Sequence, residues 1–295
     1  MSDTPLYFYD DPQRWGRMLL FAAKQMGHSA AHLFQRTDPV PAGARAFVRI
    51  ATNHDMQKRA RKLIKRLTQE NVRVFPPADI APLYDNKLKQ YEILKPYLPQ
   101  TFIFHEHSDV LPQLRSLPYP LVSKTAFGSG SKNVRMLSHR KQAEREAQQV
   151  FLEGGLECTT GKQHGYVYWQ EFLPGNYSDI RVIQIGARMM LLRRFNRVEV
   201  PFASGSGNFE PIAAIDNREW QAMQLTLQLS EELSAPFLAT DIIFTREGQI
   251  KLLEISFAWT AEGYIDCPFF NLQGGRLPDT GAHQFHHLVN MMLGA

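Results

Sequence analysis

The chain has 295 residues, of which 44% are hydrophobic and 21% are charged, so it is expected to form a sizeable core and is not a wholly disordered protein. The formal net charge is +4, but no basic run is mixed with aromatic residues, which argues against a nucleic-acid-binding protein. With only two cysteines a disulfide framework is excluded, and a reduced, cytoplasmic location is expected. The stretch MSDTPLYFYDD lacks the basic and apolar regions of a secretory signal, and the longest apolar runs are too short to cross a membrane.

Residues 1–80 alternate between strand-like and helical patterns, which predicts a small open α/β domain. The expected elements are a strand at 6–9, a helix at 15–26, a strand at 46–51, a helix at 56–67 and a strand at 72–75. A further helix over 82–94 leads out of this domain. One face of the helix at 56–67 is rich in Lys and Arg; a solvated face is the ordinary interpretation, and a docking surface for an acidic partner is the alternative.

The rest of the chain predicts two further regions of mixed α and β structure. The first has strands at 101–104, 121–126, 134–137 and 166–173, with a helix at 140–152. The second has strands at 179–185 and 189–195 joined by Gly186 and Ala187, a helix at 216–233, strands at 238–244 and 249–256, and a last helix at 281–293. Asp216 is a plausible N-cap for the helix that follows it.

The stretch PLVSKTAFGSGSKNV places Lys124 in a predicted strand, just before the loop residues Gly128, Ser129, Gly130 and Ser131. Small residues allow backbone N–H groups to approach a polyphosphate, and a lysine supplies a positive charge. A hairpin turn beside an unrelated lysine explains the pattern equally well. The stretch is not a GxxxxGK[ST] loop, and it is not a protein-kinase arrangement, in which the glycine loop precedes the lysine strand.

Two acidic residues stand in predicted neighbouring strands near the C-terminus. Asp241 lies in ATDIIF and Glu254 lies in KLLEIS. Acids in such apolar strands are expected to be paired or metal-bound, and two carboxylates at matching depth can hold Mg²⁺ against phosphate oxygens. A salt bridge from this pair to Arg193 or Arg194 is the alternative.

The order of these motifs resembles the ATP-grasp superfamily over nearly the whole chain. The resemblance implies an α/β (α+β) protein with the ATP-grasp fold, in which a small N-terminal α/β domain precedes two α+β subdomains that clasp ATP. The implied boundaries are an N-terminal domain at 1–80, a linker helix with a central lid subdomain at 81–172, and a C-terminal subdomain with the metal site at 173–295.

The resemblance also implies a set of site residues for ATP and Mg²⁺. The residues expected to bind the phosphates are Lys87, Lys124, Gly128, Ser129, Gly130 and Ser131. The hinge at Glu171, Phe172 and Leu173 is expected to bind adenine, and Asp179 is expected to lie near the ribose. Asp241 and Glu254 are expected to bind the metal. Asn208, in a loop expected to cover the substrate, is assigned to Mg²⁺ or phosphate.

The chain departs from the family pattern at the end of the metal motif. The family usually has Glu-x-Asn there, and this chain has Glu254-Ile255-Ser256, so either Ser256 or a water completes the metal site. The Glu-Ile-Ser ending, the FASGSG stretch and Cys267-Pro268 resemble a bacterial branch of the superfamily that often has FRASGSG. Phe202 stands where that branch has arginine, so no anion-binding role is assigned to it.

The resemblance implies an ATP-dependent carboxylate–amine ligase that works through an acyl phosphate. Arg181 and Arg194 are expected to hold the acceptor carboxylate or the leaving phosphate, since a guanidinium group matches either. The expected partners are small-molecule or peptide carboxylates and amines, with no nucleic acid and no membrane; a homo-oligomer is an open alternative. The rival functions are an ATP-grasp phosphotransferase and a nucleotide-binding regulatory protein without turnover, the latter suggested only by Ser256.

Overall fold

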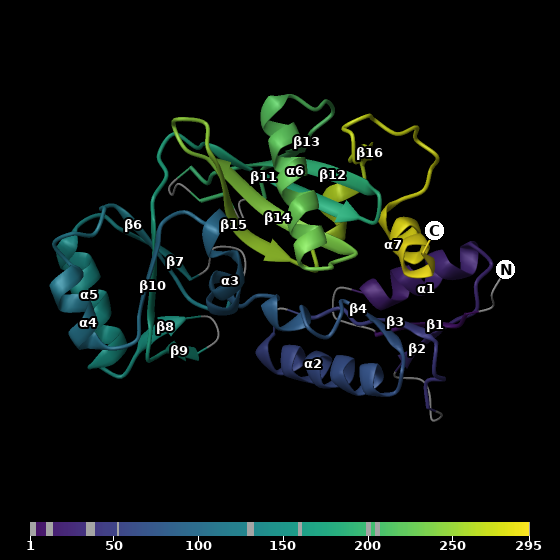
Figure 1. The fold of residues 1–295 in the computed structure, drawn as a ribbon, viewed down its shortest axis with the longest axis horizontal. Coiled ribbons are helices and arrows are strands. Elements are labelled where there is room, and N and C mark those ends of the chain that lie inside the picture. The colour runs from purple at the N-terminus through teal and green to yellow at the C-terminus, as the bar shows by residue number, and fades with distance from the viewer. Residues whose placement is uncertain are drawn as a thin grey trace.

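The structure, a computed structural model, describes residues 4–9, 14–33, 39–51, 53–128, 133–158, 161–198, 202–203 and 207–294. Its strands form a parallel sheet near the N-terminus, a central antiparallel sheet, a larger C-terminal sheet and a two-stranded hairpin. Figure 1 shows the central sheet at one end of the molecule, with the N-terminal and C-terminal sheets together at the other end.

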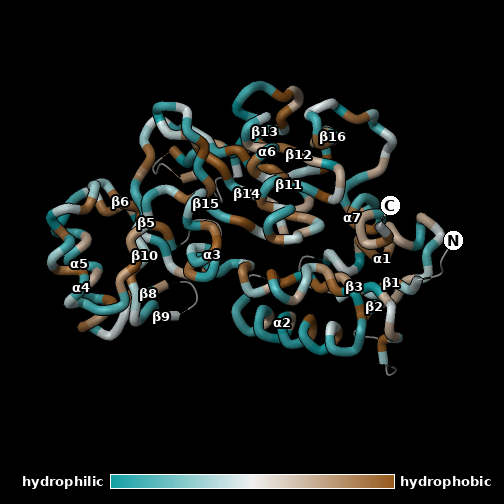
Figure 2. Tube along the Cα trace, in the orientation of Figure 1, coloured by the Kyte–Doolittle hydropathy of each residue, from teal (hydrophilic) through white to brown (hydrophobic). Residues whose placement is uncertain are grey.

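The N-terminal sheet is parallel, in the order β2-β1-β3-β4. The elements of this N-terminal region are β1 (Leu6–Phe8), α1 (Trp15–Gln25), β2 (Ala30–His32), β3 (Arg45–Phe47), α2 (His54–Gln69) and β4 (Arg73–Phe75). The apolar stripe of α2 is buried at Ala60, Ile64 and Leu67, while its hydrophilic residues dominate the tube in Figure 2. The strand β2 was not predicted, because Ala-Ala-His has no clear apolar alternation.

The segment that leads out of this sheet contains η2 (Ala81–Leu83), α3 (Lys87–Leu94) and η3 (Lys95–Tyr97). The helix was predicted from residue 82, but it begins five residues later, because the side chain of Asn86 caps it by accepting a hydrogen bond from the Lys89 N–H. Lys87 is therefore the first residue of α3.

The central part has the sheet order β5-β10-β6-β7 and all of its pairings are antiparallel. Its elements are β5 (Thr101–Phe104), α4 (His107–Gln113), β6 (Leu121–Lys124), β7 (Val134–Leu137), α5 (Arg140–Phe151), β8 (Leu156–Cys158), β9 (Gly161–Gln163) and β10 (Val167–Glu171). Apolar residues of α4, α5 and the sheet, including Val110, Ala147 and Trp169, form a separate core.

The C-terminal sheet has the order β13-β12-β11-β14-β15, and β16 pairs with β12. Its elements are β11 (Ser178–Ile185), β12 (Arg188–Phe195), β13 (Phe209–Pro211), α6 (Asn217–Glu232), β14 (Phe237–Phe244), β15 (Ile250–Ser256), η4 (Ala261–Tyr264), β16 (Phe270–Asn271) and α7 (Gln284–Leu293). The hairpin at Gly186 and the Asp216 cap are as predicted; the Asp216 carboxylate accepts from the N–H groups of Arg218 and Glu219.

A single hydrophobic core joins the N-terminal and C-terminal sheets, and it includes Leu83, Leu94 and Leu98 from the connecting segment. The central sheet has its own core, and the pocket described below is lined by residues of both parts. The domain boundaries at 80 and 172 stay a prediction. None of the helices in the described ranges combines the length and the apolar content needed to cross a membrane.

Candidate active site

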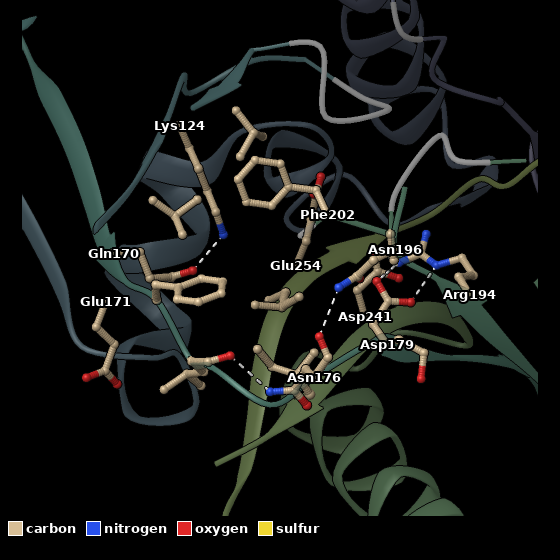
Figure 3. Close-up of a pocket in the computed structure, with 18 of the residues that line it drawn as sticks. Lys124, Gln170, Glu171, Asn176, Asp179, Arg194, Asn196, Phe202, Asp241 and Glu254 are labelled. Carbon is tan, nitrogen blue, oxygen red and sulfur yellow. Dashed lines mark hydrogen bonds and ion pairs between the residues drawn. The ribbon is translucent and has the colours of Figure 1, made fainter. Parts of the chain in front are cut away.

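A pocket lies between the central sheet and the C-terminal sheet, with about 880 Å³ of empty space, part of it open to solvent. Figure 3 shows Lys124 and Gln170 on one side of the pocket and Asp179, Arg194 and Asp241 on the other. The predicted site residues that line it are Lys87, Lys124, Gly128, Glu171, Phe172, Leu173, Asp179, Arg194, Asp241 and Glu254.

The other predicted site residues do not line this pocket or cannot be placed. Arg181 lies behind it, hydrogen-bonded to Asp241, and Asn208 and Ser256 are not among the lining residues. Ser129, Gly130 and Ser131 lie outside the described residues.

Two buried lysines reach the same end of the pocket from different elements. Lys87 Nζ lies 3.6 Å from Glu254 Oε1 and donates a hydrogen bond to the Gly128 carbonyl oxygen at 3.2 Å. Lys124, at the end of β6, is 8% exposed and donates to Gln170 Oε1 at 2.6 Å. Burial and the charge of Lys87 lower the pKa of Lys124 to about 8. An anion bound here would relieve that penalty, because it attracts both ammonium groups.

Asp85 holds the start of the glycine loop, a role that the sequence did not reveal. Its Oδ1 accepts the Gly128 N–H at 2.8 Å and its Oδ2 accepts the Gln57 side chain of α2 at 2.9 Å. Asp85 has a φ of 49°, in the left-handed region that few residues other than glycine, asparagine and aspartate adopt. Burial raises the pKa of its carboxyl group. The Asp-Asn pair before α3 was the available signal, since both residue types favour turns.

A chain of ion pairs crosses the C-terminal sheet and links Asp179, Arg194, Asp241 and Arg181 in that order. Arg194 donates to both oxygens of Asp179, from Nε at 2.7 Å and from Nη2 at 2.6 Å. Arg181 donates to both oxygens of Asp241, at 2.6 and 2.8 Å, and Arg194 Nη2 lies 2.8 Å from Asp241 Oδ2. The register explains these contacts, because Asp179 is the cross-strand partner of Arg194 and Arg181 is that of Asp241.

The electrostatics of this chain of ion pairs differ at its two acids. Burial alone would raise the pKa of Asp241, but the guanidinium groups of Arg181 and Arg194 outweigh it and hold that pKa well below its usual range. Burial prevails at Asp179, whose pKa is raised although Arg194 opposes the shift. The salt bridge that the sequence allowed between this acid pair and Arg194 is therefore formed by Asp241, and Arg181 adds a second one. Arg193 is engaged elsewhere, by Glu219 at 2.6 Å and Glu210 at 3.4 Å.

The carboxylates predicted for Mg²⁺ are adjacent, as expected, since Asp241 and Glu254 are cross-strand partners on β14 and β15. Across the described ranges, no three His, Cys, Asp or Glu side chains gather closely enough to hold a metal ion by themselves. Mg²⁺ commonly needs only one or two carboxylates when phosphates and waters supply the other oxygens, so the residues fit it. Glu254 is more available than Asp241 to bind a metal ion, because Asp241 is bound by both arginines.

Ser256 Oγ donates to the Ala258 carbonyl at 2.6 Å and accepts from the Ala258 N–H at 3.2 Å.

Apolar side chains from both sheets also line the pocket and offer a surface to a flat ring. They are Val122, Phe172, Leu173, Ile243 and Leu253. The carboxylate of Glu171 faces away from the cavity in Figure 3 and accepts the Gln100 N–H at 3.1 Å. Only the backbone of Glu171 is therefore placed to meet a ligand. Phe202 lines the pocket, and its loop neighbours 199–201 and 204–206 lie outside the described residues.

No protein-family model and no curated protein matches this sequence. Solved structures do match the fold over nearly the whole chain. A RimK domain ATP-grasp protein from Sphaerobacter thermophilus is 15% identical, with a TM-score of 0.62 over 99% of this chain and 100% of its own. D-cycloserine synthetase DcsG is 13% identical, with a TM-score of 0.67 over 98% and 99%. ATP-grasp ligase PsnB, in complex with a minimal precursor, Mg and ADP, is 13% identical, with a TM-score of 0.63 over 98% and 97%.

Proposed function

We propose that this chain, which has the ATP-grasp fold, is an ATP-dependent ligase that activates a carboxylate as an acyl phosphate and couples it to an amine. The observation that carries the proposal is the meeting of Lys87, Lys124 and Glu254 in a pocket that apolar side chains also line. Buried ammonium groups beside a partly exposed carboxylate suit a polyphosphate, and apolar side chains suit a purine ring.

Each wall of the pocket has a separate task in this proposal. The hinge at Glu171, Phe172 and Leu173 offers backbone groups and apolar side chains to the base. Lys87 and Lys124 neutralise the phosphate oxygens, and Asp85 holds Gly128 beside them. These are electrostatic and positioning contributions, which dominate catalysis of phosphoryl transfer.

Mg²⁺, when bound, neutralises and orients the phosphate oxygens. Glu254 would hold it directly, with Asp241 beside it, and a water or Ser256 would complete the site. Asp179 and Asp241 fix the guanidinium groups of Arg194 and Arg181. Arg194 lines the pocket, so its remaining N–H groups can receive a substrate carboxylate or the departing phosphate, whereas Arg181 holds Asp241 from behind the pocket.

The proposed reaction has two steps. A carboxylate oxygen of the substrate attacks the γ-phosphorus of ATP, and ADP leaves. The nitrogen of an amine then attacks the acyl carbon, inorganic phosphate leaves, and the amine proton passes to solvent. Because the acyl phosphate is already activated, the second step needs no strong base from the protein. The matched structures include enzymes whose substrates are small molecules or precursor peptides, which supports either class of substrate here.

A screen with hydroxylamine tests this proposal without knowledge of the natural amine. Pools of amino acids, short peptides and sugar acids are incubated with the protein, MgATP and hydroxylamine, and both ADP and hydroxamate are measured. The proposal predicts that the two appear together, only when a carboxylate is present. ADP with a stable phosphate ester but no hydroxamate would instead identify a phosphotransferase. Nucleotide binding without ADP across all pools would favour a regulatory protein.

A further inference from the structure

Three hydrogen bonds connect the phosphate end of the pocket to the edge of the central sheet. Lys124 Nζ donates to Gln170 Oε1 at 2.6 Å, and Gln170 Nε2 donates to Thr101 Oγ1 at 3.0 Å. Thr101 Oγ1 in turn donates to the Pro99 carbonyl oxygen at 2.7 Å. The three bonds run in one direction, so the hydroxyl of Thr101 can only accept from the amide. That requirement fixes which end of the Gln170 amide faces Lys124.

We propose that Gln170 and Thr101 are positioning residues that hold the ammonium group of Lys124 in place for phosphate binding. The inference rests on the proposed function, in which Lys124 contacts phosphate. Neither Gln170 nor Thr101 needs to touch the nucleotide through its side chain for this role.

The register of the central sheet makes the contact possible. Gln170 on β10 lies opposite Thr101 on β5 and opposite Val122 on β6, two residues before Lys124. Gln170 is 1% exposed, so its amide has few alternatives to these two partners. A lysine has a long, flexible stem, and its ammonium group would otherwise move between the groups around it.

The chemistry of glutamine suits this role better than that of glutamate. Charged groups approach Lys124 from three other elements, namely Lys87 on α3, Asp241 on β14 and Glu254 on β15. A neutral amide oxygen accepts from the ammonium group without cancelling its charge. The full positive charge therefore remains available to an incoming phosphate, whereas a carboxylate at 170 would neutralise it.

The first test measures the pKa of Lys124 in the nucleotide-free protein, by NMR titration of its side-chain Cε signal, assigned with Lys124→Met. Gln170→Leu removes the acceptor and should lower this pKa, while Gln170→Glu adds a negative charge and should raise it. Both variants should weaken ATP binding, about tenfold for Gln170→Leu, the usual effect of losing one hydrogen bond to a charged group. An unchanged pKa in both variants would overturn the inference.

The second test is a double-mutant cycle on the ATP dissociation constant. If Gln170 acts through Lys124, Gln170→Leu should have no further effect once Lys124→Met is present. Additive effects of the two changes would contradict the inference and indicate a general structural role for Gln170. If wild-type protein binds no ATP, the proposed function fails, and the pKa measurement still tests the hydrogen-bond chain.

Substitutions at Thr101 provide a second test that does not require the Gln170 variants to fold. Thr101→Val should weaken ATP binding in the same direction as Gln170→Leu, and Thr101→Ser should restore it because it keeps the hydroxyl. Thr226→Val is the matched control, since Thr226 is a buried threonine whose hydroxyl donates to Ala222 and bonds Thr240, outside the pocket lining. Its melting temperature should fall while its ATP affinity stays the same. If Thr101→Ser weakens ATP binding as much as Thr101→Val does, the hydroxyl group does not have the proposed role.

Discussion

The guanidinium group of Arg181 binds both carboxylate oxygens of Asp241, at 2.6 and 2.8 Å, across the neighbouring strands β11 and β14. Among the described residues, Glu254, the cross-strand partner of Asp241 on β15, forms an ion pair with Lys87 at 3.6 Å and with no arginine. The two acids predicted for one metal ion therefore have different surroundings. They should respond differently to loss of charge.

Asp241→Asn should destabilise the nucleotide-free protein by about 3–5 kcal/mol, because it removes the carboxylate shared by Arg194, which is buried, and Arg181, which is half-buried. Glu254→Gln should change stability by less than about 1 kcal/mol, since its carboxylate is partly exposed and its ion pair with Lys87 is long. Urea denaturation of both variants measures the contrast. Equal losses of unfolding free energy would show that Arg181 and Arg194 do not depend on Asp241.

Lys124 should make stability depend on alkaline pH. Its pKa is about 8 in the folded protein and near the ordinary 10.5 when unfolded, so the unfolded state binds more protons between these values. The wild type should therefore gain stability relative to Lys124→Met as pH rises through this window, by about 3 kcal/mol. Denaturation at several pH values measures the difference, and a difference that does not vary with pH would contradict the burial of the charged amine.

Asp85 should control the opening of the glycine loop at Gly128. Asp85→Ala removes the acceptor of the Gly128 N–H, and hydrogen exchange at that amide should speed up by about tenfold or more. Asp85→Asn should have a smaller effect, because asparagine keeps one carbonyl oxygen and tolerates the left-handed backbone. Asp279→Ala is the matched control: it removes a similar Asp-to-Gly281 bond on an exposed loop. Equal exchange at Gly128 in the Ala and wild-type proteins would rule out this role.

Ser256→Ala should be milder than Glu254→Gln when ADP formation is measured. The Ser256 hydroxyl is engaged with the backbone of Ala258, and a water can replace a weak neutral ligand. A loss below about tenfold is expected for Ser256→Ala, against more than about a hundredfold for Glu254→Gln, which removes a charge next to the phosphates. If the two losses are alike, the hydroxyl binds the metal directly and the serine fully replaces the family's asparagine.

Apolar alternation and turn residues were enough to predict the hairpins β11–β12 and β14–β15, and hence the adjacency of Asp241 and Glu254. The strands β2, β8, β9, β13 and β16 were not predicted, because strands of two or three residues depend on pairing with distant segments. The partners of Asp241 were open for the same reason. Which arginine meets an acid depends on the register between strands. The sequence left Arg193 and Arg194 as alternatives and did not indicate Arg181, which binds Asp241 together with Arg194.

Polar residues outside the recognisable motifs were the hardest to assign. Asp85, Gln57 and Thr101 were not assigned from the sequence, and each is hydrogen-bonded to a segment far along the chain. Their roles became visible only when the fold placed α2, α3 and β5 around Gly128 and Lys124.

The central claim is that a carboxylate attacks ATP before any amine takes part, and positional isotope exchange tests it most directly. ATP carrying oxygen-18 in the β–γ bridge is incubated with the protein, Mg²⁺ and the carboxylate pools, without amine. Reversible formation of an acyl phosphate would let the β-phosphate of bound ADP rotate, so the label should move to a non-bridging position. The account predicts exchange that requires a carboxylate and is lost in Glu254→Gln. ADP formation that needs the amine and shows no exchange without it would contradict the account.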